Sequence, residues 1–384
     1  MYNHVSPNRL LSSKVLKVNH LNRYYWSSSA CMRKYTKMEF REWIESKSAK
    51  TNIDEEITIS SFNLLNRHYA FKNLFGYVAP SFLAWHYRFP LLNKTINQLK
   101  CDIMCFQEME CSIYKKHWKM MLKGYDSYFV RKPPADYWGD KPPDFMDGVS
   151  IFVNSKRFEV QDKLELHFGE LASQGKCQLT DDLCKRLLSR NTVALILKLH
   201  DKHTNKTIYV ANTHLYWSPK FNDVKVLQTK LLLNALTDFI DVKDPHIIIA
   251  GDFNSNSNSS VYRLLDSNNN KTHKINVKEC PEFSAYNYGT DNQFVNEDNE
   301  INNPLLLTSS YNTLIKPNDL KFTCHTKEFS DYIDHIFISP NNFKVSGVLG
   351  NVNESYLDTN SVIGFPDKHF PSDHIPLVCS LYYT

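Results

Sequence analysis

Long apolar runs are missing from this chain of 384 residues, although 42% of its residues are hydrophobic. No stretch approaches the roughly 18 consecutive apolar residues of a membrane-spanning helix, so we expect no membrane span. A secretory signal is missing as well, because the N-terminal region lacks an apolar core of about 7–15 residues. The hydrophobic content is instead spread along the chain, which predicts a folded protein with a sizeable core.

Paired cysteines are also missing. The nine cysteines are an odd number, none of them forms a C-x-x-C motif, and several lie in apolar runs. These features favour buried free thiols in a reducing compartment over a disulfide framework or a zinc site. The net charge of +4 is compatible with a polyanionic substrate but is too small to argue for one.

Acidic residues are missing from the start of the chain, where basic residues and serines occur and Glu39 is the first acid. This composition is typical of a mitochondrial presequence, and a disordered basic tail is the alternative. We therefore predict that residues 1–45 form a basic leader plus linker and that the protein is mitochondrial, or otherwise cytoplasmic. Residues 37–50 are expected to form a short polar helix or linker. One folded domain is then expected over residues 53–384.

Strands and helices alternate in the first part of this domain, whereas strands with few helices follow in the last part. The Asn- and Ser-rich segment near 255–304 predicts a loop insertion that contains one short helix and otherwise little structure. The pattern predicts an α/β fold: a four-layer sandwich of two packed, mostly antiparallel β-sheets with helices on the outside.

Polar clusters follow five of the apolar segments. In each cluster, acid, amide or imidazole side chains occur where a strand is expected to end. Each cluster alone could be a turn after a strand, but five in one chain indicate a metal-assisted, phosphate-cleaving site. The residues concerned are Asn63, Glu108, His214, Asp252 with Asn254, and Asp373 with His374.

Glu108 fits a magnesium ligand, because an ionised acid at the end of a buried strand needs a counter-charge. Gln107 or Asn63 could complete the ligand set, and a salt bridge from Glu108 to Arg or Lys is the alternative. Asp252 and Asn254 are two residues apart in a segment expected to be extended, so we expect both on one face. The alternative for this pair is a turn in which the Asp side chain accepts from the backbone.

His214 and His374 suit hydrogen bonding to a non-bridging phosphate oxygen. A lone histidine such as His214 could equally be a core or turn residue. Asp334 is expected in mid-strand, where an unpaired acid is costly, so a histidine or metal partner is predicted. Asp373 could support His374 or the attacking water.

With these residues laid out, the chain resembles the endonuclease/exonuclease/phosphatase superfamily from about Ile57 to the C-terminus, outside the Asn-rich insertion. The segments most resemble the branch that contains deadenylases, nocturnin and Angel proteins. Within that branch, KPPADYW, DFMDGVSIF and the basic leader look most like the fungal mitochondrial Ngl-type RNA exonucleases. The matching segments are WHYRFPLLNKTINQLKCDIMCFQEME, MDGVSIFVN, NTHLYWSPKFNDVKVLQ, GDFNS, YIDHIF and PSDHIPL.

The resemblance implies a magnesium-dependent 3′-to-5′ RNA exonuclease, with manganese as a possible substitute, that releases 5′-mononucleotides from a single-stranded 3′ end. The alternatives are a phosphatase or phosphodiesterase acting on a nucleotide 2′-phosphate, a 2′-5′ linkage or a 2′,3′-cyclic phosphate. An inactive binding protein is disfavoured because every expected metal and phosphate residue is present. Leucine-rich repeats are not seen in this sequence, so docking through them to a large deadenylation complex is not expected.

The resemblance also implies residue roles at the reacting phosphate. Glu108 would be the main magnesium ligand with Asn63 nearby, and Asp252 would position or activate water. Asn254 and His214 would contact the scissile phosphate.

Four other positions match the branch around this centre. His374 would stabilise the pentavalent oxygens, with Asp334 and Asp373 supporting it and the metal. Pro219 and Phe329 would flank the terminal base, which is a sequence-tolerant contact. Asp147, in the D-G-x-x-I-F segment, would bind substrate, and His335 stands where the family often has an aromatic residue.

Overall fold

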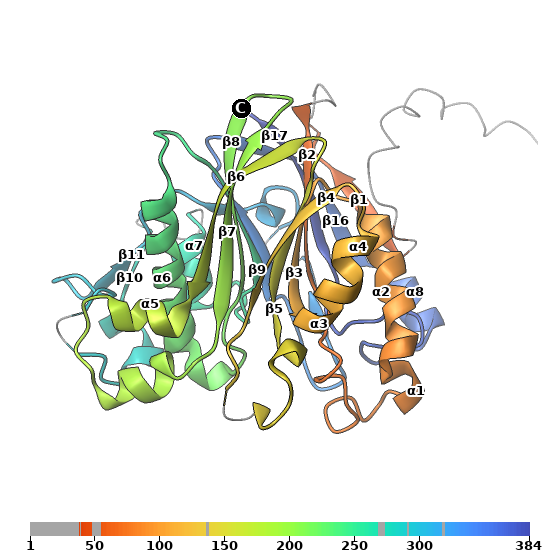
Figure 1. The fold of residues 1–384 in the computed structure, drawn as a ribbon, viewed down its shortest axis with the longest axis horizontal. Helices are drawn as coiled ribbons and strands as arrows, with labels where there is room; N and C mark the ends of the chain where they lie inside the picture. Colours follow the sequence, from red (N-terminus) through yellow and green to blue (C-terminus); the bar gives the residue numbers. More distant parts are fainter. Residues whose placement is uncertain are drawn as a thin grey trace, which may run out of the picture. The chain divides into compact units, whose positions relative to one another are not determined.

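The computed structural model describes residues 38, 40–47, 55–135, 138–267, 273–289, 292–316 and 319–384. Two β-sheets pack face to face, and helices cover their outer faces (Figure 1). This arrangement confirms the predicted α/β sandwich. The predicted leader lies mostly outside the described residues, so its role as a presequence stays a prediction.

The first sheet has the strand order β1-β16-β17-β2-β3-β5-β4. Among these pairs only β2 and β3 are parallel, and the others are antiparallel. Helix α2 (Trp85–Leu99) buries Leu92 and Ile96 in the apolar cluster that also contains Phe62 and Phe106 of this sheet. The strands are β1 (Arg41–Glu45), β2 (Ile57–Asn63), β3 (Ile103–Glu110), β4 (Tyr125–Arg131), β5 (Asp147–Asn154), β16 (Phe343–Val352) and β17 (Leu377–Tyr383).

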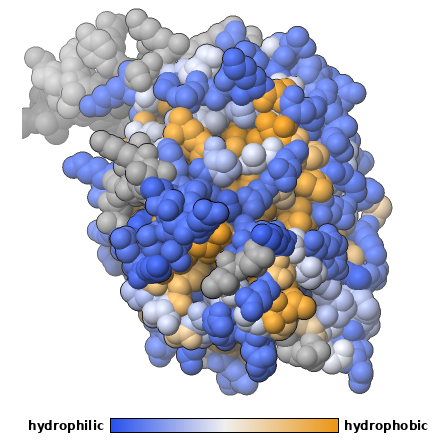
Figure 2. Space-filling model, turned by 90° about the vertical axis from the view of Figure 1, so that its left-hand side faces the viewer, coloured by the Kyte–Doolittle hydropathy of each residue, from blue (hydrophilic) through white to orange (hydrophobic). Residues whose placement is uncertain are grey.

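The second sheet has the order β12-β15-β9-β8-β7-β6, and only β8 and β9 run parallel in it. Figure 2 views the side of α5 and α6, where hydrophilic residues cover most of the surface between smaller hydrophobic areas. The apolar side of these helices therefore faces the sheet. The strands are β6 (Phe158–His167), β7 (Val193–Asp201), β8 (Lys206–His214), β9 (His246–Asp252), β12 (Thr308–Ser309) and β15 (Asp334–Ile338), and the helices are α5 (Phe168–Gln174), α6 (Asn222–Phe239) and α7 (Ser260–Leu265).

Several short elements lie outside the two sheets. Helix α1 (Pro80–Leu83) precedes α2, and a small hairpin pairs β13 (Cys324–His325) with β14 (Ser330–Asp331). The remaining short helices are α3 (Cys111–Ile113), α4 (Lys119–Met121) and α8 (Glu354–Thr359). Each strand of this hairpin has only two residues.

The core between the sheets explains why the central strands are apolar runs and not alternating patterns. All seven residues of β2 and all seven of β9 are buried, because each strand is covered on both faces. Ile59 and Ile151 of the first sheet share one apolar cluster with Leu197 and Ile248 of the second.

Strand β1 corrects the prediction of a polar helix or linker over residues 37–50. It pairs antiparallel with β16 at the edge of the first sheet. The Arg41 side chain is buried there and donates to the carbonyl oxygens of Gly350 and Leu349 at 2.7 and 3.0 Å. Backbone carbonyl groups thus compensate the burial of the Arg41 charge. The polar composition of the segment does not indicate that such acceptors are available.

The Asn-rich segment near 255–304 is more ordered than predicted. Strands β10 (Lys274–Asn276) and β11 (Glu300–Asn302) form a two-stranded sheet, and Phe294 and Ile301 are buried against α6 and α7. Asparagine side chains in this segment accept hydrogen bonds from nearby backbone N–H groups. The Asn292 side chain, for example, accepts from the N–H groups of Phe294 and Val295. The asparagines therefore build turns between packed residues.

Two further predictions concern unpaired cysteines and the lack of a membrane-spanning helix. Each of the eight cysteines in the described residues is a free thiol, and six are buried. This confirms the expectation of unpaired cysteines. Among the described helices, none has both the length and the apolar content needed to cross a bilayer.

Candidate active site

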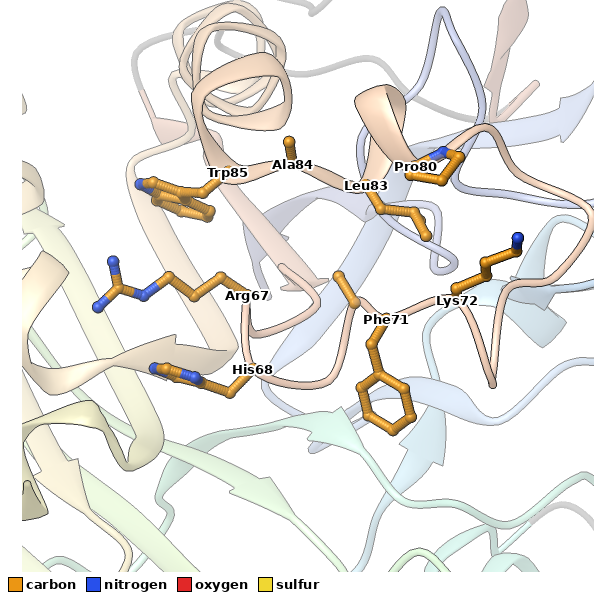
Figure 3. Close-up of a pocket in the computed structure, with 9 residues that line it drawn as sticks. Arg67, His68, Phe71, Lys72, Pro80, Leu83, Ala84 and Trp85 are labelled. Carbon is orange, nitrogen blue, oxygen red and sulfur yellow. The ribbon is translucent and has the colours of Figure 1, made fainter. Parts of the chain in front are cut away.

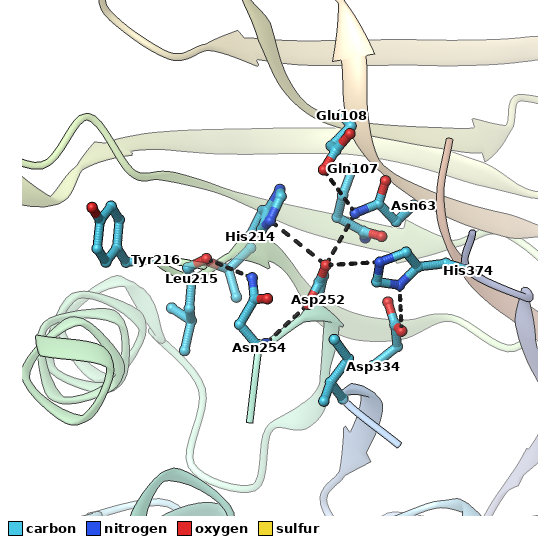
Figure 4. A network of polar contacts seen from close by, with 12 residues as sticks. Asn63, Gln107, Glu108, His214, Leu215, Tyr216, Asp252, Asn254, Asp334 and His374 are labelled. Carbon is cyan, nitrogen blue, oxygen red and sulfur yellow. Dashed lines mark hydrogen bonds and ion pairs between the residues drawn. The ribbon is translucent and has the colours of Figure 1, made fainter. Parts of the chain in front are cut away.

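The sheet topology brings the predicted polar clusters together at one edge of the sandwich (Figure 4). Strands β2 and β3 run parallel, as do β8 and β9, so their carboxyl ends meet in pairs. His214 pairs with Asp252 across one boundary, and Asp252 pairs with Asp334 across the next. Gly251 is required here, because a Cβ would lie 2.1 Å from the carbonyl oxygen of Thr213, and its φ is +151°.

Asn63 links the two main carboxylates of the site. Its side-chain nitrogen donates to Glu108 Oε1 at 3.2 Å and to Asp252 Oδ2 at 3.0 Å. Glu108 Oε2 also accepts from the backbone N–H of Asn66 at 2.8 Å. Glu108 has a φ of +54° at an irregularity in the pairing of β3 with β5, and this conformation breaks the alternation of β3.

Glu108 has no basic partner: none of the ion pairs in the described part of the chain includes it. Two basic residues near Glu108 in the fold pair with other acids, since Arg67 lies 2.6 Å from Glu110 and Lys132 lies 2.7 Å from Asp147. Burial, with the Asp147 and Asp373 carboxylates nearby, raises the pKa of Glu108 to about 7. No Arg or Lys in the described residues forms an ion pair with Glu108, which disfavours the salt-bridge alternative and leaves the carboxylate available to a bound cation.

His374 forms a buried pair with Asp334. Its Nδ1 donates to Asp334 Oδ2 at 2.8 Å, and its Nε2 lies 3.7 Å from Asp252 Oδ2. Burial alone would lower the pKa of His374, but the surrounding acids, with Asp334 foremost, raise it well above its usual value. The predicted histidine partner of Asp334 is confirmed, although Asp334 begins β15 and does not lie in its middle.

His214 lies on the other side of Asp252, with its Nε2 3.6 Å from Asp252 Oδ2. Burial, Lys132 and His374 lower the pKa of His214 well below its usual value, so this imidazole is neutral. Burial and the Asp334 carboxylate raise the pKa of Asp252 to about 6. The two histidines that flank Asp252 thus differ in charge at neutral pH.

Asp252 and Asn254 do not share an extended segment, and this prediction was wrong. Asn254 has a left-handed backbone with φ of +48°, and its N–H donates to Asp252 Oδ1 at 2.9 Å. This is the turn that was the alternative, and asparagine tolerates it well. The Asn254 side chain donates to the Leu215 carbonyl oxygen at 3.0 Å, which fixes the chain that follows His214.

Asp373 is half-buried beside His374. One carboxylate oxygen of Asp373, the Cys324 sulfur and a His374 ring nitrogen lie within 4.8 Å of one another. A second such group consists of Asp252, Asp334 and His374. Side chains able to hold a metal ion are therefore concentrated at this edge.

Of the residues predicted to contact the base or substrate, Pro219 and Phe329 are exposed and Asp147 is buried near Glu108. Pro219 begins a short 3-10 helix (Pro219–Phe221) and is exposed. Phe329 is 47% exposed in the turn between β13 and β14. Asp147 is fully buried, accepts from the Tyr69 hydroxyl and pairs with Lys132, so it orients these two side chains. Substrate contact by Pro219, Phe329 and Asp147 stays a prediction.

The interior beneath the site contains polar contacts that the sequence did not reveal. Gln107 donates to Asn212 Oδ1 at 2.7 Å between the two sheets, and its own side-chain oxygen is buried without a hydrogen-bond partner, so its place in the ligand set of Glu108 stays a prediction. Asn212 in turn donates to the carbonyl oxygens of Phe106 and Ser150 at 2.9 Å each. Burial in a run of apolar strand residues was the available signal, because a buried amide must find partners.

Arg88 is a further positioning residue that received no role from the sequence. It is fully buried and donates to the carbonyl oxygens of Leu64, Leu65 and Pro371. These contacts join the segment after β2 to the segment before His374. The W-x-x-R pattern in α2 was the available signal, since a buried arginine needs several acceptors.

Comparison with known proteins relates this arrangement to characterised families. The Endonuclease/Exonuclease/phosphatase family matches residues 60–374. The CCR4-Not complex 3'-5'-exoribonuclease subunit Ccr4 of Saccharomyces cerevisiae is 35% identical over 334 residues, which are 84% of this chain and 38% of that protein. The Candida albicans subunit is 33% identical over 338 residues, 84% of this chain and 41% of that protein. The chain thus spans about two fifths of the length of these relatives.

Solved structures with the same fold include ANGEL2, described as a 2',3'-cyclic phosphatase, in complex with adenosine-2',3'-vanadate. It has a TM-score of 0.69 and 23% identity, and the match covers 89% of this chain and 98% of that one. The human Nocturnin catalytic domain with bound sulfate has a TM-score of 0.60 and 19% identity, with coverage of 90% and 98%. These relatives agree with the predicted branch, whereas the Ngl-type resemblance stays a prediction. The match over residues 60–374 shows that this chain belongs to the Endonuclease/Exonuclease/phosphatase family.

Proposed function

We propose that this protein is a magnesium-dependent 3′-to-5′ exoribonuclease that removes 5′-mononucleotides from a single-stranded RNA end. The observation that carries the proposal is the buried chain of contacts from Glu108 through Asn63 and Asp252 to His374 and Asp334. The similarity to two Ccr4 exoribonuclease subunits supports RNA as the substrate.

The donor set fits a divalent cation with oxygen ligands. Glu108 lacks a basic partner, and Asp334 Oδ1 is buried without a hydrogen-bond partner. Burial and neighbouring carboxylates raise the pKa values of Glu108 and Asp252, as expected where a cation is needed to neutralise them. Glu108 would hold the ion, because magnesium prefers carboxylate oxygens, and the Asn63 nitrogen that donates to Glu108 would orient this carboxylate. When bound, the ion would neutralise charge on the phosphoryl oxygens.

The side chains of this protein supply the remaining chemistry. Asp252, with a pKa of about 6, orients the attacking water and can accept its proton near neutral pH. The Nε2–H of protonated His374 donates to a non-bridging oxygen as negative charge grows there. Neutral His214 is a second donor, while Asp334 keeps the His374 ring in place.

The substrate is tested by offering several phosphodiesters to the purified protein with magnesium. The probes are 5′-labelled poly(A), a mixed RNA, a 2′-5′ oligoadenylate, a nucleotide 2′-phosphate and adenosine 2′,3′-cyclic phosphate. Stepwise shortening of poly(A) or mixed RNA with release of 5′-mononucleotides is expected. Preferred opening of the cyclic phosphate, or preferred attack on one of the other two probes, would replace the exoribonuclease proposal with a phosphatase or phosphodiesterase.

For the leader we propose mitochondrial targeting, based on its basic, acid-free composition. A fluorescent reporter fused to residues 1–45 is expected in mitochondria. Diffuse cytosolic fluorescence would contradict this assignment and leave the exoribonuclease proposal untouched.

A further inference from the structure

A pocket of about 520 Å³ opens beside the candidate active site. Figure 3 shows its two walls, which are formed by residues 67–72 and residues 80–85. The volume lies within the usual range of small-molecule and nucleotide pockets, roughly 300–1,000 Å³. None of the contacts described for the active site uses the interior of this pocket.

A short turn connects the pocket directly to Glu108. The backbone N–H of Asn66 donates to Glu108 Oε2, and the Asn66 side-chain oxygen accepts from the N–H of His68 at 2.8 Å. The next side chain, Arg67, is fixed by Glu110. Arg67 and His68, which line the pocket, therefore follow directly after Asn66, whose N–H donates to the proposed metal ligand Glu108.

The lining suits a nucleotide. Trp85 is half-buried and packs against Phe89 with ring centroids 5.3 Å apart, so its indole is held in place. Leu83 adds a buried apolar floor, and Phe71 is 45% exposed at the edge. Lys72 is exposed, and in the described part of the chain it forms no ion pair. Figure 3 shows Trp85 and Lys72 at opposite ends of the pocket, which suits a nucleotide whose base stacks at one end and whose phosphate lies at the other.

The position also fits the path of a strand. In-line displacement requires the attacking water and the leaving oxygen on opposite sides of the phosphorus. Asp252, which orients the water in the proposed mechanism, reaches Glu108 through Asn63, and the pocket lies beyond Glu108. The leaving oxygen belongs to the upstream strand, and a strand that leaves on the Glu108 side would reach the pocket.

We propose that this pocket binds an upstream nucleotide of a single-stranded RNA substrate, with a base against Trp85 and Leu83 and a backbone phosphate beside Lys72. The proposal rests on the proposed exoribonuclease function. It predicts that longer strands are cleaved more efficiently, because the pocket contributes affinity only when an upstream nucleotide reaches it.

The test compares kcat/KM for a ten-residue and a two-residue oligoadenylate in Lys72→Glu and Trp85→Leu. Trp85→Leu should lower the long-to-short ratio about 5- to 150-fold, the range of one lost base contact. Lys72→Glu should lower this ratio as well, because it places an acid beside the phosphate. Leucine keeps apolar packing against Phe89 while removing the indole face. Leu74→Ala and Lys123→Glu are matched controls, since both residues are exposed outside the pocket, and they should keep the wild-type ratio.

An unchanged ratio in both pocket variants would overturn the proposal, as would a ratio lowered equally in the controls. A change in self-association with an unchanged ratio would assign the pocket to a protein contact instead. If the wild-type protein cleaves no RNA, the proposed function fails. Whether the pocket binds RNA is then tested separately, by measuring binding of the labelled ten-residue strand to Asp252→Asn. Loss of that binding on adding Lys72→Glu supports the pocket, and equal binding overturns it.

Discussion

The Nδ1 nitrogen of His374 lies 2.8 Å from Asp334 Oδ2, and this buried pair sets the charge of the imidazole that faces Asp252. His214, at 3.6 Å on the other side of Asp252, lacks an equivalent acid on its second nitrogen, because its Nδ1 is buried without a hydrogen-bond partner. The pKa values of the two histidines are consequently shifted in opposite directions. One ring is then a charged donor and the other a neutral one.

Replacing Asp334 with asparagine tests whether Asp334 acts on His374 through its negative charge or only through packing. The variant keeps the size of the side chain but removes the negative charge that raises the pKa of His374. We expect kcat for RNA cleavage to fall about 10²- to 10³-fold, the usual cost of weakening one donor that stabilises charge in the transition state. The alkaline limb of the pH profile should move to lower pH, because His374 then loses its proton earlier.

The thermal unfolding midpoint of Asp334→Asn is the control for folding. A rate loss with an unshifted pH profile would mean that Asp334 acts only by packing. The role assigned to His374 as a charged donor would then fail.

Phe329→Ala tests the predicted contact with the terminal base. Binding of an adenine-ended RNA should weaken by about 1–3 kcal/mol, and binding of a uracil-ended RNA by less, because a purine offers more stacking area. Cleavage of a small phosphodiester without a base should be nearly unchanged. Ile363→Ala, which removes another exposed apolar side chain, is the matched control. Equal losses on RNA and on the small phosphodiester would make Phe329 a packing residue.

Asp201 predicts an acid-dependent stability far from the reacting centre. Burial would raise its pKa, but hydrogen bonds from Arg157 and Tyr383 lower the pKa below its usual value. An acid with a lowered pKa stabilises the fold above its unfolded-state pKa of about 4, and this stability is lost as pH falls through the folded-state value. Urea unfolding should therefore show a free energy of unfolding that falls more steeply below about pH 4 in the wild type than in Asp201→Asn.

The exposed Asp126→Asn is the control for this pH dependence, and it should follow the wild-type curve. Identical acid dependence in the wild type and Asp201→Asn would show that the contacts with Arg157 and Tyr383 do not determine the acid stability.

The sequence predicted the edge where the site forms because several apolar runs there stop at a polar residue. It identified Glu108, Asp252, His214 and His374, which the fold brings together. Glu108, His214 and Asp252 lie at or near strand ends, which are visible in the pattern of apolar residues, whereas His374 lies just before β17.

Other features of the site depend on register and backbone conformation, which the pattern does not contain. The left-handed conformations of Glu108 and Asn254 arise where a strand pairing is irregular or a turn begins. The direction of Gln107 depends on the partner that the opposite sheet presents, Asn212. Strand β1 was not predicted because its buried Arg41 donates hydrogen bonds to carbonyl groups more than 300 positions away, those of Gly350 and Leu349.

The most direct test of the account is Glu108→Ala, examined for RNA cleavage and for magnesium binding. Removal of the proposed metal ligand should reduce cleavage of saturating poly(A) to below about a tenth of the wild-type rate, because a metal that acts in the transition state is worth several kcal/mol. Calorimetric binding of magnesium should be lost with it. The unfolding midpoint should not fall, since the variant removes an acid without a basic partner. A variant that keeps more than about a tenth of the rate, or that binds magnesium like the wild type, would contradict the central claim that Glu108 holds the catalytic ion.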